Sequence, residues 1–340
     1  MKKLLCLVLA LVLCLACLSS FAEGDTFGAD GATAGKTIGY IIPGPDNYCQ
    51  VQRDSFIHMA DIEGWTVQEL NAEWSFANEL SIVEDLIEKG VDAIIVQTNN
   101  AAACGEEIEK AAAAGIPFFL VAGSGTEDQM APVCVVEGNW AIAGTNAVNL
   151  IHEAFPDGAK VAIIGGAEAA TVTMSINEAF DARNEELNAN IETVYYQPAE
   201  YQRAIAMEKM QDLISSSIDF DVVFVHNADM ANGSLQVMQE AGVIKPIVTC
   251  NGNSVDIAMV KEGTALGTTE FCPTKEGYLM FRVCKAVLEG KTVAPNVPNA
   301  GVLITKDNLN EVIPWDTAEF YTNYIGQIWD YEAEFSQYVK

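Results

Sequence analysis

The sequence is poor in basic residues for its length. Its 340 residues include 18 Lys and Arg against 47 Asp and Glu, which gives a formal net charge of −29. A surface of this charge repels nucleic acid and anionic lipid, so nucleic-acid binding is a poor hypothesis. The acids are spread along the chain, and we interpret them as a solvated surface and not as an interaction tail.

The patterns that mark enzymes and metal sites are also missing. The three histidines, His58, His152 and His226, are scattered, and the chain has no HExxH pattern, nucleophile elbow or calcium loop. No two of the six cysteines after residue 22 form a CxxC unit, which excludes the common zinc spacings. A glycosidase needs two facing carboxylates, and no motif locates such a pair. We therefore predict no catalytic residue, no metal site and no cofactor.

The first residues have the order of a secretory signal. Two lysines precede the apolar run Leu4–Leu18, and Ser20-Phe21-Ala22 places small residues at the two positions that a signal peptidase reads. The run is shorter than the roughly 20 residues of a membrane span. We predict a signal peptide over residues 1–22 and export to the periplasm or the outer face of the cytoplasmic membrane. Membrane association is expected only through this leader or through a lipid on Cys17.

Residues 23–35 are rich in Gly, Ala, Asp and Thr and predict a flexible tether. From Lys36 onward, short apolar runs alternate with longer helical patterns. The predicted strands are Thr37–Ile42, Thr66–Leu70, Ala93–Val96, Phe118–Val121, Val161–Ile164, Ile191–Tyr195, Val222–Val225 and Ile247–Thr249, and the predicted helices include Val51–Glu63, Ala77–Lys89 and Ala101–Ala114. Nearly all-apolar strands separated by helices indicate α/β architecture with parallel sheets covered on both faces.

This alternating series occurs twice. Residues 84–96 and 211–225 both carry an acidic or amide residue, then Asp-Leu-Ile, and then an Asp that opens an apolar strand. We therefore predict two similar doubly wound lobes. Ligands of open α/β sheets sit at the carboxyl ends of the strands, so the strand-end residues of both lobes should line one cleft. The strand-end amide is Asn99 or Asn100 in the first lobe, of which we select Asn100, and Asn227 in the second.

From Lys36 to about Asn308 the chain resembles the periplasmic sugar-binding proteins of ABC transporters, of the ribose-binding type. The order of strands and several short motifs carry this resemblance. The motifs are Gly90-Val91-Asp92-Ala93-Ile94-Ile95-Val96, Ala114-Gly115-Ile116-Pro117, Gln197-Pro198-Ala199-Glu200-Tyr201, Val225-His226-Asn227-Ala228-Asp229-Met230-Ala231 and Leu303-Ile304-Thr305-Lys306-Asp307-Asn308. The related lactose-repressor family carries a DNA-binding helix-turn-helix where this chain has the predicted signal peptide.

The resemblance implies the periplasmic binding protein-like I fold, in which two lobes are joined by three crossings and close about a hinge. On this basis we expect residues 36–138 plus 272–300 to form the N-terminal lobe. Residues 139–271 plus 301–340 are expected to form the C-terminal lobe.

The resemblance also implies a set of ligand-binding residues. It places first-strand loop contacts on Tyr48 and Cys49 with a polar contact at Asp46, a stacking ring on Tyr201 and an amide on Asn227. The full predicted set is Asp46, Tyr48, Cys49, Asn100, Gly123, Asn139, Met174, Tyr201, Asn227, Asn251 and Phe271.

Departures from the family pattern concern the ligand. Ala122 and Gly123 stand where sugar binders often carry Asp-Arg, and an Arg expected near Met174 is missing. The usual late Asp is Asn251 and the usual Gln is Phe271. The pocket is therefore expected to be less charged and more aromatic than a ribose site, which would suit a pyranose, a deoxy-sugar, a nucleoside or another amphipathic small molecule.

These observations predict a monomeric solute-binding protein of an ABC importer, which binds a small polar, sugar-like ligand between two lobes and delivers it to a membrane permease. Two alternatives stay open. In the first, the chain is a sensor that presents its ligand to a chemoreceptor or receptor kinase. In the second, it binds nucleosides or other non-sugar solutes.

Overall fold

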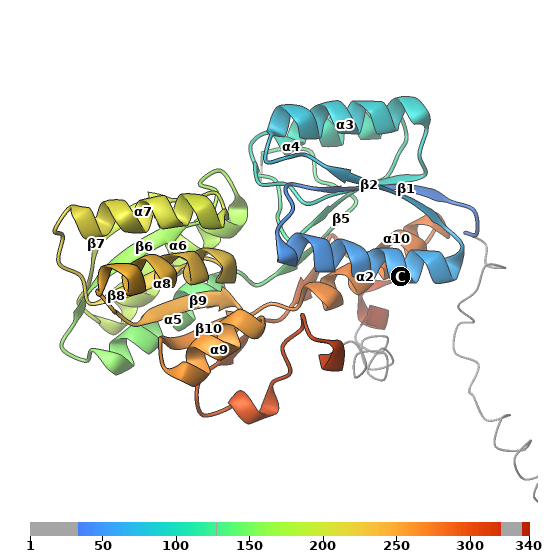
Figure 1. Ribbon diagram of the computed structural model, residues 1–340. Helices are drawn as coiled ribbons and strands as arrows, with labels where there is room; N and C mark the ends of the chain where they lie inside the picture. The colour runs from blue at the N-terminus through green and yellow to red at the C-terminus, as the bar shows by residue number, and fades with distance from the viewer. Residues whose placement is uncertain (1–32, 127, 321–334) are drawn as a thin grey trace, which may run out of the picture.

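The structure is a computed structural model that describes residues 33–126, 128–320 and 335–340. It consists of two lobes, each built on one sheet with helices on both faces (Figure 1). The predicted signal peptide, Cys17 and most of the predicted tether lie outside the described residues.

The N-terminal lobe contains a fully parallel sheet in the order β11-β5-β4-β3-β1-β2. Helices α2 and α10 cover one face, and α3 and α4 cover the other (Figure 1). The bounds are β1 Thr37–Ile42, α2 Asn47–Glu63, β2 Thr66–Asn71, α3 Phe76–Lys89, β3 Ala93–Val96, α4 Cys104–Ala113, β4 Phe118–Val121, β5 Cys134–Gly138, α10 Pro273–Leu288 and β11 Asn296–Asn299.

The C-terminal lobe contains a sheet in the order β12-β10-β9-β8-β6-β7, parallel except that β12 runs antiparallel to β10. Helices α5 and α6 cover one face, and α7, α8 and α9 cover the other. The bounds are α5 Ala141–Ala154, β6 Ala159–Gly165, α6 Thr171–Leu187, β7 Ile191–Pro198, α7 Arg203–Ser215, β8 Val222–Val225, α8 Ala228–Ala241, β9 Ile247–Asn251, α9 Ser254–Glu262, β10 Ala265–Glu270 and β12 Val302–Ile304, followed by the short 3-10 helix η1 Leu309–Glu311. The last described element, the 3-10 helix η2 Ser336–Tyr338, packs against the N-terminal lobe.

The two sheets repeat one strand order. The run β2-β1-β3-β4 of the first lobe corresponds to β7-β6-β8-β9 of the second, which is the doubly wound arrangement. The central strands are buried along their whole length because helices cover both faces. The predicted fold class is therefore confirmed.

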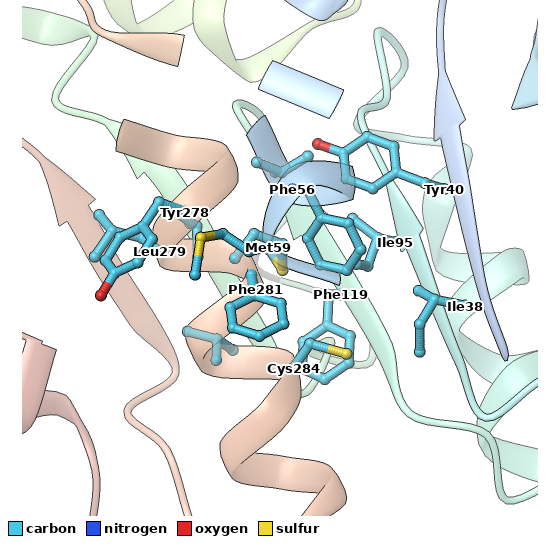
Figure 2. Close-up of a cluster of buried hydrophobic side chains, with 14 of the residues drawn as sticks. Ile38, Tyr40, Phe56, Met59, Ile95, Phe119, Tyr278, Leu279, Phe281 and Cys284 are labelled. Atoms are coloured by element: carbon cyan, nitrogen blue, oxygen red, sulfur yellow. The ribbon is translucent and has the colours of Figure 1, made fainter. Parts of the chain in front are cut away.

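One large core cluster lies between the first sheet and helices α2 and α10. Figure 2 shows Phe56 and Met59 of α2 facing Tyr278, Leu279 and Phe281 of α10 beneath the strands. Although α2 and α10 are more than 200 residues apart in sequence, they lie side by side in this lobe (Figure 1). Packing of α10 thus returns the chain to the lobe in which it began.

The described chain passes between the lobes at three places. These are Gly138 to Ala141, Glu270 to Pro273, and Asn299 to Val302. Two backbone segments of this region are joined directly, because the Asn139 N–H donates to the Asn299 carbonyl at 3.3 Å.

The last described residues do not lie where the sequence analysis placed them. We expected residues 301–340 in the C-terminal lobe, but Phe335 is buried in the core of the N-terminal lobe. Val339 also forms a bridge with Val293 there. The physical reason is an apolar surface beside the end of α10, where Val287 and Leu288 pack against the same core cluster as Phe335.

Three residues that precede Lys36 are also packed against the N-terminal lobe. Thr33, at the end of the predicted tether, is fully buried and donates its hydroxyl to the Glu63 carboxylate at 2.7 Å. The Gly35 N–H donates to the Gly64 carbonyl at 3.1 Å. The tether prediction is therefore wrong for residues 33–35, because these contacts fix them to the end of α2.

In the part of the chain that the structure describes, no helix is long and apolar enough to cross a membrane. The cysteines at positions 49, 104, 134, 250, 272 and 284 are free thiols. No group of His, Cys, Asp and Glu side chains among the described residues has the arrangement of a metal site.

Candidate ligand-binding site between the lobes

A cavity lies between the two lobes. Its walls come from the carboxyl ends of strands in both sheets, the position at which open α/β sheets bind ligands. The lining residues are Pro43, Asp46, Tyr48, Cys49, Trp74, Gln97, Asn99, Ala122, Trp140, Val172, Tyr201, His226, Asn227 and Asn251.

Two equivalent turns, one in each lobe, supply aromatic rings to this cavity. Trp74 follows β2 and Tyr201 follows β7, and these are corresponding strands of the two sheets. Both residues have left-handed backbones, with φ of 60° and 58°, as do the glutamates that precede them. Such a conformation costs an ordinary residue about 1–2 kcal/mol, so the turns hold the rings in place at a cost in stability.

Each of these rings lies over a glycine. A Cβ atom on Gly44 would overlap the indole of Trp74, and a Cβ atom on Gly166 would overlap the ring of Tyr201. Gly44 follows β1 and Gly166 follows β6, which are again corresponding strands. The glycines therefore leave the space that the two rings occupy.

Three lining residues carry a buried polar atom without a hydrogen-bond partner among the described residues. They are the Gln97 side-chain oxygen, the Trp140 indole nitrogen and the His226 Nε2. Most buried polar groups in proteins are paired, so a group of such atoms around one cavity calls for an explanation. The indole nitrogen can only donate and the amide oxygen can only accept.

The protonation of His226 follows from its surroundings. Its Nδ1 accepts a hydrogen bond from the Gly166 N–H at 3.3 Å, so the neutral ring carries its proton on Nε2. Burial lowers the pKa of His226 to about 3, which keeps the ring neutral near pH 7. His226 therefore offers a second hydrogen-bond donor to the cavity.

The other polar side chains of the cavity also shape its walls. The Asn227 side chain accepts from the Met230 N–H at 2.8 Å and donates to the Tyr201 carbonyl at 3.1 Å, which ties the α8 cap to the aromatic turn. The Asn251 side chain accepts from the Ala228 N–H at 3.0 Å. These amides keep part of their capacity for a ligand, because each has a further lone pair or N–H.

The cavity wall is almost uncharged. Asp46 is the carboxylate among the lining residues, and one of its oxygens caps α2 by accepting from the Cys49 N–H at 2.7 Å. Burial raises the pKa of Asp46, against the lowering by this hydrogen bond. The lining residues include no Lys or Arg.

The lobes touch beside the cavity. The Ala101 N–H donates to the Ala169 carbonyl at 3.0 Å, and the Ser124 N–H donates to the Thr171 hydroxyl oxygen at 3.0 Å. The first residue of each pair belongs to the N-terminal lobe and the second to the C-terminal lobe. The structure therefore shows the lobes closed on each other.

Six of the eleven residues in the predicted ligand-binding set line the cavity. They are Asp46, Tyr48, Cys49, Tyr201, Asn227 and Asn251. Whether they bind a ligand stays a prediction, but the structure brings them together from both lobes.

The other five predicted residues lie outside the cavity wall. Asn100 is replaced by its neighbour Asn99, because the Asn100 N–H turns back to the Thr98 hydroxyl at 3.1 Å. Met174 is 37% exposed, and Val172 at the start of the same helix takes the inward position.

The remaining three lie beside the crossings or the region where the lobes touch. Asn139 is exposed and Phe271 is fully buried, with its ring 4.3 Å from that of Trp140. Trp140 thus occupies the wall in place of both. Gly123 is buried with a Cβ position 3.1 Å from the Thr98 carbonyl oxygen, so it provides close backbone packing.

The cavity also contains residues that the predicted set omits. They are Pro43, Trp74, Gln97, Asn99, Ala122, Trp140, Val172 and His226. The strand-end rule would have found Gln97 and His226, because each directly follows an apolar strand. Trp74 and Trp140 also follow strands, but they stand three and two residues beyond the strand ends, and the directions of their side chains depend on a left-handed turn and on a crossing.

A family model described as a periplasmic binding protein domain matches residues 38–292. The chain belongs to this family. It is therefore a member of a family of binding proteins and not of enzymes, and the resemblance found in the sequence is confirmed.

Relatives and solved structures agree with membership in the periplasmic binding protein domain family. The ribose import binding protein of Escherichia coli K12 is 26% identical over 308 residues, which cover 90% of this chain and 99% of the relative. An ABC transporter solute-binding protein from Mycobacterium smegmatis with bound glycerol has a TM-score of 0.77 at 22% identity, covering 82% of this chain and 97% of that one.

A third comparison concerns a different system with the same fold. The fructose-binding periplasmic domain of a hybrid two-component system has a TM-score of 0.76 at 19% identity, covering 89% of this chain and 99% of that domain. At these identities the two solved structures show the shared fold alone.

Proposed function

We propose that the chain is an extracytoplasmic solute-binding protein that encloses a neutral, polyhydroxylated ring, a monosaccharide or a cyclic polyol, between its lobes. We further propose that it presents this ligand to the permease of an ABC importer. The observation that carries the proposal is the set of three unpaired buried polar atoms in the cavity wall.

These atoms match the chemistry of hydroxyl groups. The Gln97 oxygen requires a donor, whereas the Trp140 N–H and the His226 Nε2–H require acceptors. A hydroxyl group supplies both functions, so a ligand with several hydroxyls can pair all three atoms. Each such hydrogen bond contributes about 0.5–1.5 kcal/mol net to binding. It also removes the free-energy cost of leaving a polar atom of the cavity wall buried without a partner.

The aromatic rings select the shape of the ligand. Trp74 and Tyr201 come from opposite lobes, so a ring bound between them presents an apolar C–H face to each.

The charges of the wall exclude many other solutes. No Lys or Arg lines the cavity, so a ligand carboxylate or phosphate would lose its hydration without a cationic partner. Amino acids and sugar phosphates are therefore poor ligands. A ligand in contact with both lobes favours the closed state by its difference in affinity for the closed and open states.

Isothermal titration calorimetry of the chain from Glu23 onward tests the ligand class. We expect binding of at least one of D-ribose, D-galactose, D-fructose and myo-inositol, and no binding of L-glutamate or glucose 6-phosphate. A saturating ligand at 100 times its Kd should also stabilise the protein by about 2.7 kcal/mol. If none of the neutral compounds binds, or if an anion binds more tightly than they do, the proposed ligand class is contradicted. Adenosine in the same series examines the nucleoside alternative.

The partner requires a separate experiment. The fold also occurs in the periplasmic domain of a two-component system, so the fold does not distinguish transport from sensing. We expect the ligand-loaded protein to stimulate ATP hydrolysis by its cognate permease complex in proteoliposomes. Stimulation of a receptor kinase instead would favour the sensor.

A further inference from the structure

Glu276 connects the cavity wall to the region where the chain crosses between the lobes. It lies in the first turn of α10, directly after the second crossing, and is fully buried. One carboxylate oxygen accepts from the Tyr48 hydroxyl at 2.8 Å and from the Gln52 side-chain N–H at 2.7 Å. Tyr48 lines the ligand cavity, whereas Glu276 does not.

The other carboxylate oxygen of Glu276 faces the third crossing. It accepts from the Asn299 side-chain N–H at 3.3 Å, and the same amide group donates to the Cys272 carbonyl at 3.1 Å. The Asn299 carbonyl accepts from the Asn139 N–H in the first crossing. Through Asn299, Glu276 therefore contacts a network that includes all three described crossings.

Tyr48 carries this network into the binding site. Its ring packs against Trp140 and Trp315, with ring centroids 6.2 Å and 5.8 Å away. Trp315 in turn donates its indole N–H to the carbonyl of Asn251, another cavity residue, at 2.8 Å. A change in the position of Tyr48 would thus alter the wall on both sides of the cleft.

The hydrogen-bond pattern fits an ionised carboxylate better than a carboxylic acid. The amides of Gln52 and Asn299 present N–H groups, and the Tyr48 hydroxyl completes a set of three neutral donors. If Glu276 were protonated, its O–H could be donated only to the Tyr48 hydroxyl oxygen, which reverses the present hydrogen bond. The phenol proton of Tyr48 would then be buried without an acceptor. The amino end of α10 also favours the anion.

Burial opposes this ionised form. It raises the pKa of Glu276 to about 7, while the three hydrogen bonds act in the opposite direction and the Glu137 carboxylate of β5 raises it further. Tyr40 of β1 and Cys272 of the crossing also lie near, but burial raises the pKa of Tyr40 well above 10 and that of Cys272 to about 12, so both stay neutral near pH 7. The Glu276 carboxyl thus changes its charge in the neutral range.

We propose that Glu276 is a positioning residue for the binding site, whose ionised carboxylate holds Tyr48 in the cavity wall and whose protonation weakens ligand binding. Its action passes through Tyr48, because the carboxylate itself lies behind the wall. The proposal rests on the proposed function for its effect on affinity, but the effect on Tyr48 does not depend on any ligand.

The first test uses ligand-free protein. The ring-carbon NMR signal of Tyr48, assigned with Tyr48→Phe in protein labelled at tyrosine Cζ, should shift with a midpoint near pH 7. Glu276→Gln should abolish this shift. The matched control is Glu270→Gln, since the pKa of Glu270 is also about 7 and Glu270 ends the strand before the same crossing. A Tyr48 signal that does not titrate, or that still titrates in Glu276→Gln, would overturn the proposal.

The second test measures affinity with the tightest binder among D-ribose, D-galactose, D-fructose and myo-inositol. If only the ionised form binds well, the wild-type Kd should rise about tenfold from pH 8 to pH 6, since the ionised fraction falls about tenfold. Glu276→Gln and Tyr48→Phe should each reduce this ratio to about twofold or less, and Glu270→Gln should keep it.

The two tests separate the possible failures. If none of the four compounds binds, the proposed function fails while the NMR titration still decides the role of Glu276. If Glu276→Gln does not fold, Tyr48→Phe supplies the affinity test, because it removes the same hydrogen bond from the other side. A wild-type pH ratio retained in Tyr48→Phe would overturn the proposal.

Discussion

Gly166 lies directly under the ring of Tyr201, so a Cβ atom at position 166 would overlap that ring. Gly166 does not have a left-handed backbone, and alanine would be tolerated there but for the ring. The corresponding relationship between Gly44 and Trp74 in the other lobe shows that both aromatic walls depend on a missing side chain.

The first prediction concerns this contact. Gly166→Ala should displace the Tyr201 ring and lower ligand affinity by roughly tenfold or more, since overpacking of a filled site costs about 1–3 kcal/mol. Calorimetric titration measures the change. In the Tyr201→Ala background the added methyl group has no ring to displace, so Gly166→Ala should cost nothing further. Additive losses in the double variant would show that the two residues act separately.

The second prediction concerns the donor on His226. His226→Phe removes the Nε2–H and should weaken binding of a hydroxylated ligand by about 2- to 12-fold, the equivalent of 0.5–1.5 kcal/mol. The matched control is His152→Phe, because His152 lies on α5 away from the cavity. Equal affinities of both variants and the wild type would remove His226 from the site.

The same histidine gives a third prediction, on stability. Its folded pKa of about 3 lies below the unfolded value of about 6.5, so the unfolded chain binds a proton that the folded chain does not between these values. Stability from this group is therefore lost as the pH falls below about 6.5, by about 1.4 kcal/mol per unit. His226→Phe should lose about 2 kcal/mol less than the wild type between pH 7 and pH 5 in urea unfolding. An identical pH profile in both proteins would contradict the assigned neutral state.

The fourth prediction concerns the contact between the lobes. Thr171→Val removes the hydroxyl that accepts from Ser124 and should shift the ligand-free protein toward an open form, visible as a larger radius of gyration in X-ray scattering. Ligand affinity should fall about twofold or more, because closure loses the hydrogen bonds of this hydroxyl with the N–H, hydroxyl and carbonyl groups of Ser124, each worth about 0.5–1.5 kcal/mol. Thr145→Val is the control, since that hydroxyl donates within its own helix at 3.2 Å. Scattering unchanged in both variants would mean that the contact does not govern closure.

The fifth prediction concerns two buried carboxyl groups behind the cleft. Glu79 on α3 and Glu107 on α4 are both buried, and neither oxygen of Glu107 has a partner among the described residues. Burial raises the pKa of Glu107 to about 9 and that of Glu79 to about 7, and the repulsion between the two adds to the shift of Glu107.

Because both folded pKa values exceed the unfolded value of about 4.5, this pair binds more protons in the folded chain, and stability falls as the pH rises from 4.5 to 9. Glu107→Gln should raise the free energy of unfolding by about 1–3 kcal/mol at pH 8.5 and by less than 0.5 kcal/mol at pH 5. Thermal melts at both values measure this, with Glu109→Gln at an exposed position of the same helix as control. A gain of equal size at both values would point to packing instead of charge.

The sequence predicted the fold well where burial is continuous. The strands Ala93–Val96, Phe118–Val121 and Val222–Val225 have the predicted bounds, because four consecutive apolar residues between helices leave no other arrangement. The strand Asn296–Asn299 reads Asn-Val-Pro-Asn and was not predicted, since only its pairing with β5 makes it extended. Tertiary contact decided that element, and local preference did not.

The site was predictable to the level of strand ends and no further. Asn227 and Asn251 line the cavity because each ends or follows an apolar strand. Asn100 missed the wall by one residue, since a turn through Thr98 sets the direction of each side chain. Whether Trp140 or Phe271 faces the cavity depends on how two crossings pack, which no spacing in the sequence reveals.

The return of the chain to its first lobe has a practical consequence. Thr33 and Phe335 both belong to the N-terminal lobe, so they stay at a fixed separation if the lobes move as rigid bodies. Two fluorophores attached to exposed positions of this one lobe would therefore give no signal on ligand binding. A reporter of binding needs one dye on each lobe, for example at the exposed positions Ile62 and Ile244, which lie on α2 and just beyond α8.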